Sequence, residues 1–263
     1  MGFVKRPEEI GRIEYALSHP RFVNGEMLTV DFLTDPEVVE HILPPPLEPA
    51  GSPTVTAMVG RWQSNCVGDF HGGAIYVAAR HEGIDGRYVL AMYMDNDQPT
   101  IYGRDLFGEP KKIAASALHR HGEAFHGWVE RGGVRLIELH GLLPTELGPS
   151  ESEGVNFNFK ARPAADGIGL EEDAILTRAS FQAKVTAARE GAGSVVLRGS
   201  VHDPLDELPI RSVLAGQFVE CDLIASCESV ARVPKDDFLP YHHGRHDDWA
   251  ALDTESAAVV PVA

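Results

Sequence analysis

The sequence predicts a mainly β protein, α+β by content, in which antiparallel strands predominate and helices are few and short. The 26 glycines and 18 prolines divide the chain into short runs of alternating or apolar residues. Few segments have the 3.6-residue period of an amphipathic helix, and glycines separate alternating or valine-rich runs at two places. Short strands between frequent turn residues are typical of antiparallel sheets that form sandwiches or barrels.

The first part of the chain is expected to contain two short helices and one strand. Glu8–Leu17 is a candidate helix, and Met27–Leu33 alternates as a strand does. Pro36–Ile42 is expected to form a brief helix capped by Thr34 or Asp35, because proline occupies its first turn and three consecutive prolines follow it.

Later segments are expected to be strands joined by turns at glycine. The expected strands are Val55–Trp62, Ala74–Ala79, Tyr88–Met94 and Val213–Val230. A turn is expected at residues 83–86, and paired strands are expected around residues 131–133 and 190–193.

The domain organisation follows from length and composition. A chain of 263 residues, 43% hydrophobic and 24% charged, suits one large globular domain or two small ones. We expect a single domain over residues 1–234. Residues 235–263 contain aspartates, histidines and alanines without periodicity, so we expect them to form a flexible tail.

Charge and hydropathy exclude some classes of partner. A net charge of -16 argues against a nucleic-acid partner, because phosphate binding needs clustered Lys and Arg. No apolar run approaches the length of a membrane span, and the first residues lack the apolar core of a signal peptide, so we expect no membrane partner and a cytoplasmic location. Cys66, Cys221 and Cys227 are scattered and odd in number, which predicts buried thiols and no disulfide framework or thiolate metal site.

The stretch 103–114 holds the most informative residues. Lys111 and Lys112 follow Pro110 and lead directly into the apolar residues Ile113 and Ala114, so a strand that is at least half buried is expected there. Successive side chains of a strand point to opposite faces, which separates the two lysines and draws Lys111 into the core. Burial favours the free amine, which is the form that attacks carbonyl groups.

The same stretch resembles the acetoacetate decarboxylase family. Asp-Asn at 95–96, Gly-Arg-Asp at 103–105 and Pro-Lys-Lys at 110–112 are similar to that family's Asp-Asn, Gly-Arg-Glu and Pro-Lys-Lys series. Residues 34–36 with the Pro-Pro-Leu-Glu-Pro turn at 45–49, residues 156–160 and residues 204–209 occur in the family's order. The resemblance runs from about Phe22 to Val233.

The resemblance implies a fold and an activity. The fold is a set of antiparallel sheets that close into a cone-like barrel around the lysine, with a few short peripheral helices. Lys111 matches the family's Schiff-base lysine, the substrate is a small-molecule keto acid, no cofactor is needed, and a homo-oligomer is implied.

Three positions depart from the family. Its members carry an active-site arginine after the asparagine that matches Asn24, but this chain has Gly25 there. They also carry two active-site glutamates, where counting back from Lys111 gives Ala57 and Gly72. Imine formation is therefore better supported than decarboxylation of acetoacetate in particular, and a larger or differently functionalised keto acid is expected.

The candidate site residues follow from these considerations. The catalytic candidates are Lys111, with Lys112 and Glu109 beside it; the substrate-binding candidates are Arg61, His71, Tyr76 and Arg104. Glu109 is either a solvated turn residue or a carboxylate that shuttles protons, and if ionised next to Lys111 it would favour the ammonium and oppose activation. No metal site is expected, because His119 and His121 lack a third ligand at fixed spacing and the histidines at 242, 243 and 246 lie in the expected tail.

The leading prediction is a Schiff-base-forming lyase that decarboxylates a β-keto acid through an imine on Lys111. The alternatives are an aldolase or dehydratase that uses the same imine on a keto acid, and a non-catalytic small-molecule binding protein on the same scaffold. Trapping of an imine by borohydride distinguishes the enzymes from the binding protein.

Overall fold

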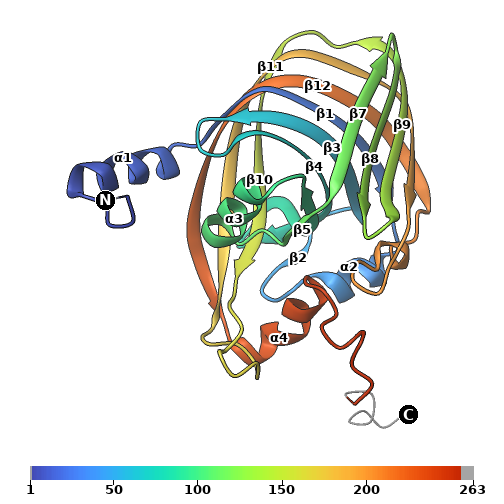
Figure 1. Cartoon of the computed structure of the whole chain (residues 1–263). Coiled ribbons are helices and arrows are strands. Elements are labelled where there is room, and N and C mark those ends of the chain that lie inside the picture. Colours follow the sequence, from blue (N-terminus) through green and yellow to red (C-terminus); the bar gives the residue numbers. More distant parts are fainter. Residues whose placement is uncertain (1, 256–263) are drawn as a thin grey trace.

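The computed structural model describes residues 2–255, and its dominant feature is one large twisted sheet that closes on itself (Figure 1). The helices are α1 (Pro7–Ser18), α2 (Pro36–Ile42), α3 (Asp97–Tyr102), the π-helical turn η1 (Gly103–Phe107), the 3₁₀ turn η2 (Leu205–Glu207) and α4 (Lys235–Gly244). The strands are β1 (Arg21–Leu33), β2 (Glu48–Pro49), β3 (Thr54–Ser64), β4 (Gly68–His81), β5 (Ile84–Met94), β6 (Lys111–Ile113), β7 (Ala115–His121), β8 (Ala124–Arg131), β9 (Val134–Glu146), β10 (Ser150–Lys160), β11 (Ala174–Leu197) and β12 (Ser212–Val233).

The barrel contains seven strands in the order β10-β5-β4-β3-β1-β12-β11, and it closes because β10 also pairs with β11. All its pairings are antiparallel except β10 with β5, which is parallel and limited to Asn156↔Arg87 and Phe157↔Tyr88. This short pairing leaves the rest of that edge of β5 free. The three residues of β6 occupy it further along, where Met92 pairs with Lys111.

A second layer covers one side of the barrel. Strand β11 continues beyond the barrel and pairs with β9, which carries β8 and β7 (Figure 1). The main apolar core lies between this layer and the outer face of the barrel. It contains, for example, Val30, Val59 and Ile75 from the barrel with Val129 and Leu139 from the second layer.

The predicted fold class is confirmed: the protein is mainly β, forms a barrel and has only short helices. The predicted helix Pro36–Ile42 has the bounds of α2, and the helix expected at Glu8–Leu17 is α1 within a residue at each end. The turn after β4 consists of Glu82 and Gly83, whose φ angles are both positive as a two-residue hairpin turn requires.

The turn expected at residues 190–193 is wrong, because these residues lie within β11. Gly191 and Gly193 are placed where β11 passes from the barrel to the second layer. A Cβ at Gly193 would lie 2.9 Å from the Cα of Gly216, and one at Gly191 would collide with the carbonyl of Leu142. The glycines therefore permit close approach of backbones and do not reverse the chain.

The flexible tail expected from residue 235 is also wrong for the residues that form α4 and those just after it. Phe238 is fully buried and its ring stacks on Phe159 with centroids 4.6 Å apart. His242 and Arg245 are buried as well, so α4 lies against the lower end of the barrel in Figure 1. One aromatic anchor and several polar contacts hold this helix, which is why its sequence shows no hydrophobic period. Residues 256–263 lie outside the described part of the chain.

The strand expected after Pro110 is shorter and more exposed than predicted. Strand β6 has only three residues, and Ile113 is 55% exposed. Among residues 2–255, no helix combines the length and the apolar character that a membrane span requires.

Candidate active site

The barrel encloses a cavity of about 760 Å³ that all seven of its strands line. Its wall is largely apolar and rich in methionine, with Met27, Met58, Trp62, Phe70, Met92 and Met94 among the lining residues. Its polar lining includes Thr29, Asp31, Thr56, Tyr76, Asp85, Arg87, Glu109, Lys111, Asn156 and Gln217. A mainly apolar cavity with a few convergent polar groups is the usual form of a small-molecule site.

Lys111 reaches this cavity from β6, at the seam where β10 leaves the edge of β5. Its side chain is buried, with the residue 7% exposed, and its Nζ lies 2.8 Å from Oε2 of Glu109. Glu109 is equally buried and also lines the cavity. The cavity thus contains an amine in direct contact with a group that can accept and return protons.

Gly103 makes room for this pair. A Cβ built on Gly103 would lie 2.5 Å from Nζ of Lys111 and would also collide with Oε2 of Glu109. The lysine and the glutamate therefore pack directly against the backbone of η1. The glycine of the Gly-Arg-Asp motif is needed because it leaves room for these two side chains. The apolar residues after Lys112 do not bury Lys111, since Ile113 points into solvent.

The peptide before β6 is held by groups from distant parts of the chain. The carbonyl of Phe107 accepts a hydrogen bond of 2.5 Å from Thr177 Oγ1, and the carbonyl of Gly108 accepts one of 2.5 Å from Arg245 Nη2. Arg245 also donates to the carbonyl of Phe159 at 3.1 Å. Gly108 has a φ of +77°, which a side chain would strain. The segment after α4 therefore fixes the backbone that presents Lys111.

Lys112 points away from the cavity into a buried ionic network. Its Nζ lies 2.8 Å from Asp203 Oδ1 and 3.1 Å from Asp247 Oδ1, and it donates to the carbonyl of His202 at 2.7 Å. Arg131 bridges the same two aspartates at 2.7 and 2.6 Å. The placement of Lys112 among the catalytic candidates is therefore corrected: it ties β6 to the C-terminal segment, and strand alternation separates it from Lys111 as expected.

Tyr76 lines the cavity close to Glu109 and to a cation that sequence reasoning missed. Burial raises the pKa of the Tyr76 phenol, the charge of Glu109 raises it further, and Arg87 opposes the shift. The phenol is consequently neutral at physiological pH and available as a hydrogen-bond donor. Arg87 comes from β5 and lines the same cavity, so it is the lysine's candidate partner for a substrate carboxylate.

A polar row crosses the cavity wall beside Tyr76. Asp31 and Thr56 are register partners, as are Thr56 and Tyr76, and Thr56 Oγ1 donates to Asp31 Oδ1 at 2.5 Å. Two inter-strand steps separate Asp31 from Tyr76, which is about 10 Å. Alternation along the predicted strand Met27–Leu33 was the signal that placed Asp31 on the opposite face from Leu28 and Val30, but it did not show which face lines a cavity.

The other substrate-binding candidates lie outside the cavity. Arg61 alternates to the outer face of β3 and pairs with Glu26 at 2.7 Å. His71 lies 3.4 Å from Asp95 and is half-buried, and Arg104 is exposed on η1. The expectation that these three residues contact the substrate is corrected, because none of them belongs to the cavity lining.

The structure also shows the surroundings of Gly25, Ala57 and Gly72, the three residues that depart from the family pattern. Gly25 packs against Trp62, whose indole would lie 3.0 Å from a Cβ there, and Gly72 packs against Met94. Ala57 faces the apolar core outside the barrel, whereas its neighbours Thr56 and Met58 line the cavity. Neighbouring residues of a strand point to opposite faces, so counting back from Lys111 with an error of one residue selects the wrong face. Thr56 and Met58, and not Ala57, face the cavity from this part of β3.

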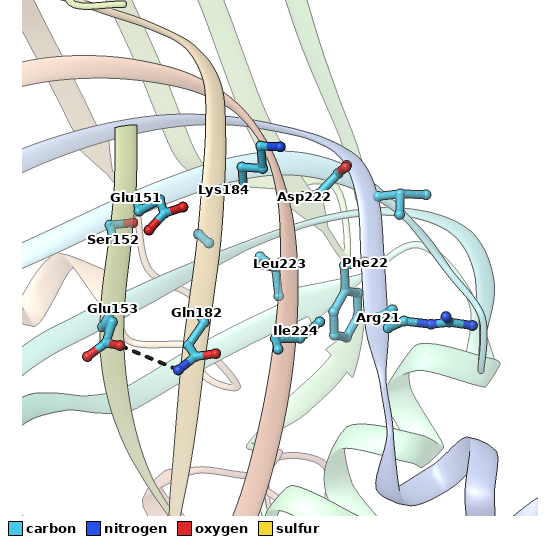
Figure 2. A pocket seen from close by; sticks show the side chains of 12 residues that line it. Arg21, Phe22, Glu151, Ser152, Glu153, Gln182, Lys184, Asp222, Leu223 and Ile224 are labelled. Carbon is cyan, nitrogen blue, oxygen red and sulfur yellow. Dashed lines mark hydrogen bonds between the residues drawn. The ribbon is translucent and has the colours of Figure 1, made fainter. Parts of the chain in front are cut away.

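A second hollow of about 480 Å³ adjoins the cavity. It is lined by residues of β1, β10, β11 and β12, among them Arg21, Glu151, Gln182, Lys184 and Asp222 (Figure 2). Gln182 donates to Glu153 across it at 3.4 Å. The two spaces adjoin, because they share five lining residues: Phe22, Ser152, Glu153, Ala183 and Leu223.

Comparison with known proteins identifies the family of this chain. The model of the family described as "Acetoacetate decarboxylase (ADC)" matches residues 7–233. The chain belongs to the acetoacetate decarboxylase family. The family resemblance drawn from the Pro-Lys-Lys stretch is thereby confirmed.

Individual relatives agree with the family match. The acetoacetate decarboxylase of Burkholderia cenocepacia (strain HI2424) is 29% identical over 209 residues, which cover 77% of this chain and 84% of the relative. That of Burkholderia vietnamiensis (strain G4 / LMG 22486) is 30% identical over the same extent. Membership places the chain among acetoacetate decarboxylase-like enzymes.

Solved structures share the fold. Acetoacetate decarboxylase from Legionella pneumophila superposes with a TM-score of 0.74 at 25% identity, over 81% of this chain and 87% of that one. The enduracididine biosynthesis enzyme MppR complexed with pyruvate gives a TM-score of 0.70 at 17% identity, over 81% and 90% of the two chains. The second similarity is one of fold alone.

Proposed function

We propose that this acetoacetate decarboxylase-like enzyme is a lyase that forms a Schiff base between Lys111 and a β-keto acid. The observation that carries the proposal is the contact of 2.8 Å between the buried Lys111 Nζ and Glu109 Oε2 at the edge of an apolar cavity. A buried amine beside a carboxylate, reachable by a small molecule, is the arrangement that imine formation needs.

The roles of the residues follow from their positions. Ionised Glu109 favours the Lys111 ammonium, so the reactive amine is the fraction whose proton has passed to Glu109. That free amine adds to the ketone, and Glu109 returns the proton to the leaving hydroxyl as loss of water gives the protonated imine. The imine then accepts the electron pair of the breaking C–C bond as carbon dioxide leaves, which gives an enamine. A proton from a neighbouring acid or from water adds to the enamine carbon, and hydrolysis of the resulting product imine releases the ketone and restores Lys111. Tyr76 is placed to donate a hydrogen bond, and Arg87 supplies positive charge for the substrate carboxylate.

The cavity supports a substrate larger than acetoacetate. Its volume of about 760 Å³ falls within the range of sites for drug-sized ligands. The methionine-rich wall offers apolar contact to the body of such a molecule. The Asp31–Thr56 pair, about two strands from Tyr76, suits a hydrogen-bond donor at the distal end of the substrate.

An experiment with a panel of keto acids tests the proposal. The protein is incubated with acetoacetate and with bulkier β-keto acids in the presence of borohydride, and the site of modification is found by intact mass and peptide mapping. The expected result is reduction onto Lys111 by at least one bulky acid, with faster carbon dioxide release than from acetoacetate. Labelling of Lys112, or no labelling by any acid that the protein binds, contradicts the assignment.

Aldol addition or dehydration of a keto acid is the second candidate, because it uses the same imine. Its support is the space beyond Lys111, which accommodates an aldehyde next to a bound keto acid. A related fold offers a precedent, since one MppR structure is described as complexed with the condensation product of pyruvate and imidazole 4-carboxaldehyde. Analysis of products by mass distinguishes condensation from loss of carbon dioxide, and a non-catalytic binding protein would give neither.

A further inference from the structure

The outer face of the second layer carries three histidines side by side. His119 of β7, His126 of β8 and His140 of β9 are consecutive register partners across the three strands. The rings of His126 and His140 are nearly parallel, with centroids 4.4 Å apart, and the rings of His119 and His126 are 6.2 Å apart. These side chains alternate with the core residues Phe125 and Leu139, so they face away from the core and from Lys111.

Glu138 completes a cluster with two of them. It lies on the same face of β9 as His140, and its Oε1 is 3.4 Å from His126 Nε2 and 3.8 Å from His140 Nε2. The ligand atoms of the three side chains all lie within 4.8 Å of one another. Arg198 holds the other carboxylate oxygen, Oε2, at 2.9 Å and so fixes the direction of Oε1.

His126 Nε2 is the unusual atom of the cluster. Among the residues that the structure describes it is buried from solvent and makes no well-aligned hydrogen bond, and its nearest acceptor, Glu138 Oε1, lies 3.4 Å away. A buried polar atom of this kind calls for a partner that the protein itself does not supply.

We propose that His126, Glu138 and His140 form a binding site for a divalent transition metal of the zinc class. Two imidazole nitrogens and one carboxylate oxygen are a common zinc ligand set with an open fourth position. Tetrahedral bonds of about 2.0–2.1 Å place ligand atoms roughly 3.3–3.4 Å apart. Glu138 Oε1 lies 3.4 and 3.8 Å from the two imidazole nitrogens, and all three ligand atoms are within 4.8 Å of one another, so small side-chain rotations bring them onto one ion. Water or His119 takes the fourth position. Arg198 donates to the second oxygen of Glu138 and so orients this carboxylate, as outer-shell groups commonly do for metal ligands.

The experiment is metal titration of tag-free, chelator-treated protein. Zn²⁺ binding is measured by calorimetry, and Co²⁺ binding is followed by the visible absorption of a tetrahedral complex. The expected result is one site per chain whose affinity falls at least about tenfold in each of His126→Ala, His140→Ala and Glu138→Gln. His121→Ala is the matched control, because it removes an exposed histidine of the same layer that lies outside the cluster.

Two outcomes overturn the proposal. One is the absence of stoichiometric binding by the wild-type protein. The other is unchanged affinity in the His126→Ala/His140→Ala double variant, which would place the metal elsewhere, for example at the histidines in the last turn of α4 and just after it. Circular dichroism of each variant verifies that the second layer is intact, and borohydride trapping on Lys111 serves as an independent check of the folded barrel.

Discussion

Lys111 and Lys112 are neighbours in the chain and opposites in environment. Lys111 faces a cavity and contacts one carboxylate, that of Glu109. Lys112 faces the C-terminal segment and contacts two, those of Asp203 and Asp247, which Arg131 also binds. Strand alternation therefore directs Lys111 into the cavity and Lys112 into an ionic network that holds the C-terminal segment.

The two lysines differ in the free space next to the ammonium group and not in burial, since both side chains are about nine-tenths buried. The ammonium of Lys112 is surrounded by fixed acceptors, whereas Lys111 has one acceptor and open space beyond it. A nucleophile needs that space for the incoming carbonyl, and a structural cation does not.

Replacement of Lys111 by Met should have the largest effect. Lys111 is the one lysine that lines the cavity within residues 2–255, so if the proposed covalent step takes place there, turnover should fall by about 1,000-fold or more while the fold persists. Steady-state assays and borohydride trapping measure this result. Residual trapping at Lys112 would mean that the two lysines exchange roles.

Lys112→Met is the complementary variant. It leaves Asp203 with Arg131 and the hydroxyl of Tyr93, and Asp247 with Arg131. Removal of one member of a buried ionic network costs about 3 kcal/mol of unfolding free energy. Denaturant unfolding measures that cost. The pH profile of imine formation should shift only modestly, and imine formation that recovers only at high pH would show that the Lys112 charge activates Lys111.

Gly103→Ala tests whether the Lys111–Glu109 pair needs the bare backbone of η1. The added Cβ would collide with both groups, and a displacement of about 1 Å can cost roughly 100-fold in rate, so we expect a loss in kcat of that order. Gly11→Ala is the control, because nothing lies within 4 Å of a Cβ there. An unchanged kcat in Gly103→Ala would show that the pair moves aside without harm.

The smallest expected effect is a pH dependence of the C-terminal anchor. Burial, followed by the charge of Arg245, lowers the pKa of His242 from 6.5 to about 4. The unfolded chain therefore binds a proton that the folded chain does not between these pH values, so stability is full above pH 6.5 and declines as the pH falls toward 4. Thermal melts across this window should show the decline in the wild type and a smaller one in His242→Gln. His121→Ala should behave as the wild type, because that histidine is exposed on β7 away from α4, and an equally steep decline in all three would assign the effect to other groups.

Several features of the protein were determined by the sequence alone. Frequent glycines and prolines between alternating runs predicted a mainly antiparallel β protein with few short helices. Pro-Lys-Lys with the motifs around it predicted the family, and that resemblance implied the barrel and selected Lys111. These are local signals, because turns, alternation and short motifs depend on residues close together in the chain.

The composition of the cavity was decided by the tertiary structure. Asp31, Thr56 and Arg87 come from three strands, and only the closed ring shows that they face the same space. Alternation tells which residues share a face but not which face lines a cavity, and this is why Arg61 was expected inside and lies outside.

The support behind the lysine was decided in the same way. Arg245 reaches the carbonyl of Gly108 across 137 positions of sequence, from a segment whose composition suggested disorder. Gly191 and Gly193 suggested a turn but allow two strands to approach closely. A glycine or a polar residue has the same local signature in either role, and only the contacts made by distant segments distinguish the roles.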